Sequence, residues 1–305
     1  MALQALTIPE NYIRTFSANW EHTVQQELKK LADKVTVDPF EGKEKIYTDI
    51  EPVTFTQRVG RLTKSNPKEI GSAKRKATKS EFKCQIIFDR SDATFLAMLG
   101  EPDSELMQEM KIAWNKSCDD GFITAATATV YGGADPFVTA ITLPSTQTVA
   151  VDFVTVGSQT NTGLTPDKLQ RAIKLFEDNN LDVMAEDFML AISPKQKEDL
   201  FQYVKSAPNA PYAQMIGAWL NNPSTKLFGF TVIISTRLSI NTSTDVRTCL
   251  AWSKRGIYAA PDKMEVKVDL RADLDHAKQI SAYGDYSFMR RREERVVKIL
   301  CDESP

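Results

Sequence analysis

Histidine and cysteine are scarce in this chain of 305 residues. There are two histidines, His22 and His276. These are too few for a histidine-rich metal centre and leave little choice for a histidine-based catalytic triad. The four cysteines are dispersed along the sequence: Cys84, Cys118, Cys249 and Cys301. No two of them have the short spacing of a zinc site. The cysteine usage predicts a reducing compartment, and neither count points to a metal.

Other signals of specific function are also missing. Neither of the glycine-rich patterns that cradle nucleotide phosphates occurs. No run of about 18 apolar residues is present, which predicts a protein without a membrane-spanning helix. Residues 1–10 lack the charged start and apolar stretch of a signal peptide, so we expect a cytoplasmic location.

The overall composition is that of an ordinary globular protein with one or two domains. Lys and Arg number 38 and Asp and Glu 40, a formal net charge of −2, and 42% of the residues are hydrophobic. A near-neutral balance argues against a dedicated nucleic-acid binder, which usually has a clearly basic domain. Overall charge therefore names no partner.

The candidate catalytic and metal-binding groups are weak. Residues 119–121 (DDG) lie within a predicted helix, and Asp269, Asp273 and Asp275 lack the spacing of a calcium loop. His276 lies beside two of these aspartates, but a lone histidine near carboxylates is more often a surface salt-bridge partner. Surface and capping roles are the favoured interpretation. The sequence predicts no enzyme, no metal and no cofactor.

The cations are concentrated in one part of the chain. Between Gln57 and Ile86 nine cations face two acids, Glu69 and Glu81, a local net charge of +7. The cations are Arg58, Arg61, Lys64, Lys68, Lys74, Arg75, Lys76, Lys79 and Lys83. Most charge runs are solvated loops, but loops beyond about 15 residues are usually functional or disordered. We expect this segment to rest on something acidic.

The first half of the chain predicts an arm, a hairpin and a long helix. Apolar spacing predicts a short amphipathic helix over 19–34. Alternating apolar residues predict two strands on either side of the basic segment, one that enters it over 50–59 and one that leaves it over 82–88. After a short helix over 92–99, residues 102–104 open the longest helix, which ends before Gly132 and is weakened by Gly121.

The second half has α/β character. Thr165–Pro166 begins a helix that runs to Asn179. A strand over 186–192 leads into Ser193–Gln196, a capping box with proline at the first helical position, and a helix to about Val204. Further strands are predicted over 226–235, 249–252, 264–270 and 295–300.

Three classes of function remain open at this point. An enzyme should contain a constellation of titratable groups, and none is legible. A nucleic-acid-binding module should interleave its basic run with aromatic residues, but residues 60–81 contain no Phe, Tyr or Trp. An assembly protein should have arms and ribbons that are too long to be stable alone, and the chain has both.

The order of these elements resembles a known family, as do several short patterns. FSANWEHTVQQELKKL (16–31) looks like its N-terminal arm, and 50–61 like the entry to its extended loop. KSCDDGFITAATATVYGG (116–133) is similar to the end of its spine helix. TKLFGFTVIISTRL (225–238) resembles its Gly-then-strand pattern, and 284–299 its C-terminal segment. The family is the major capsid protein of tailed bacteriophages, with the Hong Kong 97-type fold.

The resemblance implies an α+β chain in five parts. They are an N-terminal arm (1–43), an extended β-hairpin loop (44–88), a peripheral domain with the spine helix (89–145), an α/β axial domain (146–262) and strands returning to both domains (263–305). It also implies pentamers and hexamers of an icosahedral shell that encloses packaged double-stranded DNA without reading its sequence, a virion capsid assembled in the bacterial cytoplasm. An encapsulin-like shell around a protein cargo is the alternative.

The resemblance further implies partners and contacts. Because the arm starts almost at Met1, a separate scaffolding protein is expected unless the sequence begins at a processed start, and a portal is expected as well. We expect the basic hairpin to lie across an adjacent subunit, against acids near the start of the spine helix: Glu101, Asp103, Glu105 and Glu109. Reversing Lys74, Arg75 and Lys76 to Glu should then leave a folded subunit that assembles poorly. Trp114 and Phe122 are expected in the core.

Overall fold

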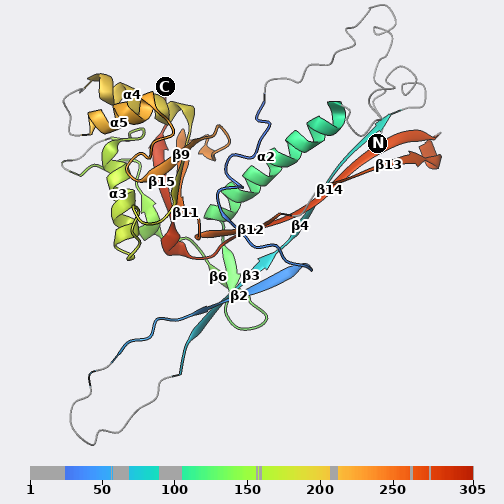
Figure 1. Ribbon diagram of the computed structural model, residues 1–305, viewed down its shortest axis with the longest axis horizontal. Helices are drawn as coiled ribbons and strands as arrows, with labels where there is room; N and C mark the ends of the chain where they lie inside the picture. Colours follow the sequence, from blue (N-terminus) through green and yellow to red (C-terminus); the bar gives the residue numbers. More distant parts are fainter. Residues whose placement is uncertain are drawn as a thin grey trace, which may run out of the picture.

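The computed structural model describes residues 25–55, 57, 69–88, 105–155, 157, 160–206, 212–261, 264–274 and 276–304. Within them the chain is an α+β structure with three sheets and four α-helices. Three short 3-10 helices are Ser145–Gln147, Ala272–Leu274 and Glu293–Arg295. Figure 1 shows a long helix and sheet that extend to one side of an α/β part, while a pair of strands leaves in another direction. None of the described helices is long and apolar enough to cross a membrane.

The spine of the molecule is helix α2, Glu105–Thr127, which lies along a five-stranded sheet. The strands are β1 (Thr36–Val37), β12 (Ile257–Pro261), β14 (Ala277–Arg290), β13 (Glu265–Arg271) and β4 (Ser80–Phe88), and β14 pairs with three of the others. Alternation along β14 turns Ile280, Ala282 and Tyr286 toward the helix, where they pack with Met110 and Cys118. The sheet thus covers one face of α2.

The long helix is confirmed, and its glycine has a packing role. A Cβ on Gly121 would lie 2.5 Å from Cε2 of Tyr286, so the glycine lets this ring cross the helix. Phe122 is fully buried, as expected, with its ring centroid 4.8 Å from that of Trp252. Trp114 is half-buried at the edge of the core, with its ring centroid 5.5 Å from that of Tyr286.

The α/β part is built around a mixed six-stranded sheet. Its strands are β7 (Thr148–Val149), β15 (Val296–Asp302), β11 (Val246–Ser253), β8 (Phe188–Ile192) and β9 (Phe230–Ile234) in spatial order, with β10 (Ile240–Asn241) paired to β11. Helices α3 (Pro166–Glu177), α4 (Pro194–Ser206) and α5 (Ala213–Asn221) lie beside it (Figure 1). The main apolar core lies between these helices and the sheet, and every residue of β8 is buried.

Two helix starts predicted from the sequence are confirmed. The backbone N–H of Lys168 donates to the Thr165 hydroxyl at 3.4 Å, and Pro166 occupies the first turn of α3. At α4 the Ser193 N–H donates to Gln196 Oε1 at 2.9 Å, and the Gln196 N–H donates back to Ser193 Oγ at 3.4 Å. This reciprocal pair is the predicted capping box.

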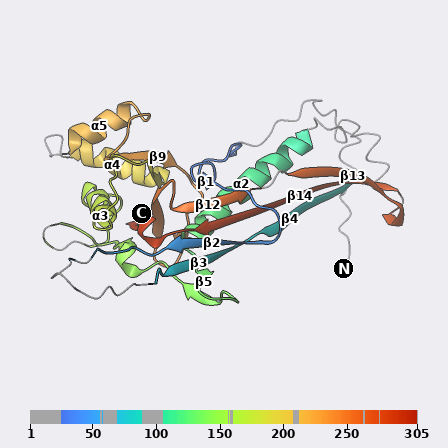
Figure 2. The same cartoon turned by 60° about the horizontal axis from the view of Figure 1, so that its bottom comes forward.

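The third sheet carries the hairpin. It contains β2 (Glu44–Ile50), β3 (Ser72–Thr78), β5 (Val130–Gly132) and β6 (Thr139–Ile141), all antiparallel. On its inner face, Tyr47, Ala77 and Val130 pack against Met289 of β14. Figures 1 and 2 both show β2 and β3 side by side, on the opposite side of β14 from α2.

The prediction of an amphipathic helix over 19–34 is wrong for the part of that range that the structure describes. Residues 25–35 contain no helix, and residues 19–24 lie outside the described part. Leu31 is buried but Leu28 is exposed, so the helical spacing does not define one buried face. The backbone N–H groups of this segment bond to an aspartate of α2 instead of to one another, as described below. The short helix predicted over 92–99 also lies outside the described residues.

The outgoing strand of the hairpin differs from the prediction. Lys79 separates β3, which pairs with β2 and β5, from β4, which pairs with β14. Lys83 therefore lies on the spine sheet and not on the ribbon. Several elements were not predicted: helix α5, the long strand β14 and the shorter strands β1, β5, β6, β7, β10 and β12. Small and polar residues such as Ser281, Gly284 and Ser287 dilute the apolar alternation of β14.

Candidate assembly site at the hairpin

A buried ion pair holds strand β3 at the base of the hairpin. Arg75 donates from Nη1 to Glu293 Oε1 at 2.7 Å and from Nη2 to Glu293 Oε2 at 2.6 Å, and each side chain is 12% exposed. Burial acts to raise the pKa of Glu293 and to lower that of Arg75, but their pairing outweighs it. The pKa of Glu293 lies below its ordinary value and the pKa of Arg75 above. Both groups remain charged, and β3 is tied to the segment that follows β14.

Arg290 connects this ion pair to the end of the spine helix. Its side chain is 0% exposed and donates from Nη1 to the carbonyls of Ala126 (3.1 Å) and Ala128 (2.7 Å). Further bonds reach the Ile141 carbonyl (3.1 Å) and Glu293 (3.3 Å). Burial lowers the pKa of Arg290, yet a guanidinium stays protonated. Arg290 thus satisfies carbonyls that the last turn of a helix leaves unpaired.

The neighbouring residue holds the other strand of the hairpin. Arg291 forms an ion pair with Asp49 of β2 at 2.5 Å. Its guanidinium also lies 4.8 Å from the ring centroid of Tyr47 and 4.9 Å from that of Tyr258, a cation–π arrangement. The end of β14 therefore fastens both strands, and we call Arg75, Asp49, Arg290, Arg291 and Glu293 the hairpin clamp.

Several predicted inter-subunit cations have partners within their own subunit. Arg75 belongs to the clamp, Lys76 Nζ lies 3.1 Å from Glu44 Oε1, and Lys79 Nζ lies 5.1 Å from the ring centroid of Phe40. Arg75 is thus corrected from an inter-subunit contact to an internal one. Reversing its charge would leave Glu293 buried beside a second carboxylate, so a folded subunit is not expected from the triple reversal.

The other predicted contact residues are placed as follows. Lys74 is exposed on β3 and makes no ion pair within the described part of the chain, and Lys83 is exposed on β4. Glu105 is the first residue of α2. Glu109 accepts two bonds from Gln25 Nε2, at 2.8 and 2.7 Å, and so has a partner in its own subunit. Outside the described residues lie Arg58, Arg61, Lys64, Lys68, Glu101 and Asp103.

Asp119 is a structural anchor that the sequence did not reveal. The surface role expected for it is wrong, because its side chain is buried in α2 at 0% exposure. It accepts backbone N–H bonds from Lys30 (3.0 Å), Leu31 (3.1 Å) and Ala32 (2.9 Å), and a side-chain bond from Gln26 (2.5 Å). The available signal was its spacing of three and four residues from the apolar Phe122 and Ile123, which places it on the same side of the helix, where a carboxylate needs several donors.

The candidate general base is not assembled. Asp273 pairs with Arg271, with Nε and Oδ1 2.7 Å apart, instead of with His276. His276 is exposed in a left-handed backbone conformation, at φ 59°, and Asp275 lies outside the described residues. In the described part of the chain no group of three or more His, Cys, Asp or Glu residues is placed to hold a metal ion.

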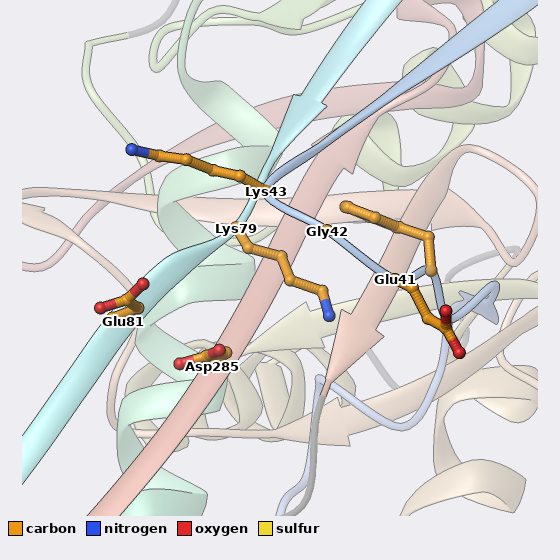
Figure 3. Close-up of a pocket in the computed structure, with 7 residues that line it drawn as sticks. Glu41, Gly42, Lys43, Lys79, Glu81 and Asp285 are labelled. Atoms are coloured by element: carbon orange, nitrogen blue, oxygen red, sulfur yellow. The ribbon is translucent and has the colours of Figure 1, made fainter.

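A polar cavity of about 400 Å³ lies beside the hairpin base. Figure 3 shows its lining, which includes Glu41, Lys43, Lys79, Glu81 and Asp285. Glu81 and Asp285 are directly opposite on the antiparallel pair β4–β14, and like charges in such positions repel. The mixed charges form no recognisable acid–base pair for catalysis.

Solved structures with the same architecture are capsids of phages. The capsid of cyanophage P-SCSP1u matches with a TM-score of 0.64 and 16% identity, over 99% of this chain and 96% of that one. The capsid of Ralstonia phage GP4 matches with a TM-score of 0.64 and 9% identity over 100% of both chains. The capsid of Myoviridae phage XM1 matches with a TM-score of 0.62 and 11% identity, over 98% of this chain and 100% of that one. The fold is the Hong Kong 97-type fold of capsid subunits, as the resemblance implied.

The family assignment rests on the sequence itself. A family model described as phage capsid protein matches residues 8–303, so the chain belongs to the phage capsid protein family. It is a major capsid protein of a phage, a structural protein of the virion capsid. No curated protein matches the sequence. The α+β fold class and the capsid function expected from the sequence are confirmed.

Proposed function

We propose that copies of this chain form the pentamers and hexamers of a closed icosahedral shell around packaged double-stranded DNA, and that the chain catalyses no reaction. The observation that carries the proposal is the β2–β3 ribbon. It is fastened at its base by the hairpin clamp, yet Ile50, Val53 and Phe55 beyond it are exposed. A two-stranded ribbon is marginal alone, and symmetric association supplies the surface that it lacks.

The five parts of the chain have different positions in this proposal. The axial part (146–262) groups around each capsomer axis, while the spine part (89–145) and the returning strands (263–305) meet neighbouring capsomers. The arm (1–43) and the hairpin (44–88) reach other subunits. The apolar core on the six-stranded sheet and the projecting ribbon support this division. DNA is enclosed without sequence readout, in keeping with the formal net charge of −2.

The ionic contacts proposed between subunits are fewer than the sequence suggested. We retain Arg58, Arg61, Lys64, Lys68, Lys74 and Lys83 as cations that face carboxylates of a neighbour, with Glu101, Asp103 and Glu105 as candidate partners. Support comes from the local excess of cations over acids in a near-neutral chain. Each exposed pair contributes about 0.2–1 kcal/mol and weakens with salt, so their effect depends on repetition around the shell.

Assembly is proposed to occur in the host cytoplasm with two further proteins. A scaffolding protein sets the size of the shell, and a portal occupies one vertex for DNA entry. The test is negative-stain microscopy of the purified chain, expressed alone and with the scaffolding protein of its phage. Closed particles of uniform size in the second sample are expected. Monomers in both samples at high concentration would contradict the proposal, and a protein cargo in place of DNA in native particles would favour an encapsulin-like shell.

A further inference from the structure

Two cysteines lie on neighbouring strands in the core of the six-stranded sheet. Cys249 of β11 and Cys301 of β15 are both 0% exposed, and both are free thiols. In the antiparallel pair β11–β15, Cys249 is opposite Ile299 and Cys301 is opposite Arg247. Side chains two positions apart on a strand share a face, so the two cysteines are diagonal neighbours on one face of the sheet.

The two thiols interact with one another. The pKa of Cys249 lies well above its ordinary value, first because of a hydrogen bond with the Cys301 thiol and then because of burial. Cys249 Sγ also lies 3.6 Å from Oε1 of Gln196, an oxygen that accepts the Ser193 N–H in the capping box of α4. Loss of the Cys249 proton would therefore leave the capping bond in place.

Hydrogen bonds on both sides of the pair hold the two strands in this register. The Lys168 ammonium, on a fully buried side chain, donates to the carbonyl of Leu300 at 3.0 Å, directly before Cys301. Beyond the pair, Arg247 Nε of β11 donates to Glu303 Oε2 at 2.6 Å, which ties the start of one strand to the end of the other. The thiols are thus kept together while the subunit is folded.

A bond between these two sulfur atoms would connect distant parts of the fold. Between Cys249 and Cys301 the chain leaves the six-stranded sheet, supplies β12, β13 and β14 to the spine sheet, and returns as β15. A crosslink would close this long excursion at its base. Crosslinks are expected to stabilise more when the loop that they close is longer, because they restrict the unfolded chain more.

We propose that Cys249 and Cys301 are an oxidation site, at which a small disulfide such as oxidised glutathione converts the two thiols into a disulfide bond within one subunit. One cysteine thiolate attacks the reagent and releases the first glutathione, and the second thiolate then displaces the other glutathione. The two cysteine sulfur atoms are oxidised, the glutathione disulfide is reduced, and the two cysteine protons end on the two released glutathione thiols.

The site responds to the surroundings of the particle. Cytoplasmic thiols stay reduced, whereas disulfides persist outside the cell. The thiolate is the reactive form, so a buried, protonated Cys249 reacts slowly, and the bond forms chiefly after the virion leaves its host. This timing rests on the proposed assembly in the host cytoplasm. The chemistry does not, and its test uses unassembled subunits, so it can fail without affecting the proposed shell.

A metal ion is a poorer occupant of this place than a disulfide. Structural zinc sites use four ligands, most of them cysteine or histidine. Within the described ranges no group of three or more His, Cys, Asp or Glu residues is placed to hold a metal ion, so the two thiols have no further ligands beside them.

The test uses the full chain with Cys84→Ser, which removes the exposed thiol. Subunits are incubated with oxidised glutathione at mildly alkaline pH, with and without a low concentration of urea that lets the core open transiently. We expect mass spectrometry of an unreduced digest to find the peptides of Cys249 and Cys301 linked. The oxidised subunit should unfold about 3–10 °C above the same subunit kept in reductant.

Two variants, each compared with itself in oxidising and reducing buffer, locate the effect. Cys301→Ala should give no linked peptide and the same unfolding temperature in both buffers. Cys118→Ala removes a buried cysteine of α2 and should keep both the link and the temperature difference. Free thiols or separate glutathione adducts at Cys249 and Cys301, with and without urea, would overturn the inference. A linked peptide without a rise in unfolding temperature would also overturn it, because the bond would then not strengthen the subunit.

Discussion

Glu293 is the residue on which the hairpin clamp depends. It accepts two bonds from Arg75 of the hairpin and one from Arg290, which in turn binds the end of the spine helix. Because all three side chains are largely buried, removing one charge leaves the others without compensation. The carboxylate therefore couples the direction of the ribbon to the position of α2.

Glu293→Gln should lower the free energy of unfolding by about 3 kcal/mol at neutral pH, because it leaves a buried Arg75 uncompensated. Since the pKa of Glu293 is depressed in the folded state, its contribution is present above its ordinary pKa and is lost as the pH falls through the folded value. The difference between wild type and variant should thus shrink in acid. Chemical unfolding of subunits at several pH values measures this.

The matched control is Glu44→Gln, which removes the partner of Lys76. That pair is more exposed, so its loss should cost no more than about 1 kcal/mol. Equal losses for Glu44→Gln and Glu293→Gln, or a Glu293→Gln effect that does not depend on pH, would refute the role given to the clamp.

Asp119 anchors the N-terminal segment on the spine helix. In Asp119→Asn one oxygen becomes an NH₂ group, which cannot accept the bonds now made to it. These are the bonds of Leu31 and Ala32 if Oδ1 is replaced, or those of Gln26 and Lys30 if Oδ2 is replaced. The cost should be about 1–3 kcal/mol, with faster amide hydrogen exchange over residues 25–35. The control is Asp120, the next residue of α2, which forms an ion pair with Arg237. Asp120→Asn weakens that pair and should leave the exchange over residues 25–35 unchanged. Unaltered exchange in Asp119→Asn would show that Asp119 does not anchor the N-terminal segment.

At the scale of elements, the sequence predicted the helices and helix starts whose signals come from residues close together in the chain. The spine helix, the capping box of α4 and the Pro166 start of α3 need residues at most a few positions apart, so one sequence contains their signals. The arm was misassigned because helical spacing cannot show that Asp119, about 90 residues away, binds its backbone. The clamp was missed for the same reason, since Arg75 and Glu293 are 218 residues apart.

Gly121→Ala tests how the spine helix packs. Alanine has the better helix propensity by about 1 kcal/mol, but its Cβ would overlap the ring of Tyr286, and overpacking typically costs about 1–3 kcal/mol. We expect a net loss of thermal stability. Gly217→Ala in α5 is the control, because its Cβ would meet just one atom, at 4.0 Å, and it should stabilise. Stabilisation by both substitutions would show that Tyr286 does not press on α2.

At the scale of the whole molecule, the chain is compact in its α/β part and extended in its hairpin. The fold family could be inferred from the order of weak patterns, and the family match over residues 8–303 confirms it. The contacts proposed between subunits could not be inferred in the same way, because one sequence does not show which residues of another copy face the basic loop. The hairpin is held at its base by the hairpin clamp and has exposed apolar side chains beyond it. We expect these side chains to become buried in the assembly.

The central claim is that this chain builds a closed shell in which the hairpin of each subunit rests on a neighbour. Electron cryomicroscopy of particles assembled from the chain and its scaffolding protein tests it most directly. The account predicts an icosahedral lattice of pentamers and hexamers, with density of another subunit over the exposed ribbon residues Ile50, Val53 and Phe55 of each hairpin. Open sheets or isolated subunits, or a closed shell in which those residues are bare, would contradict it.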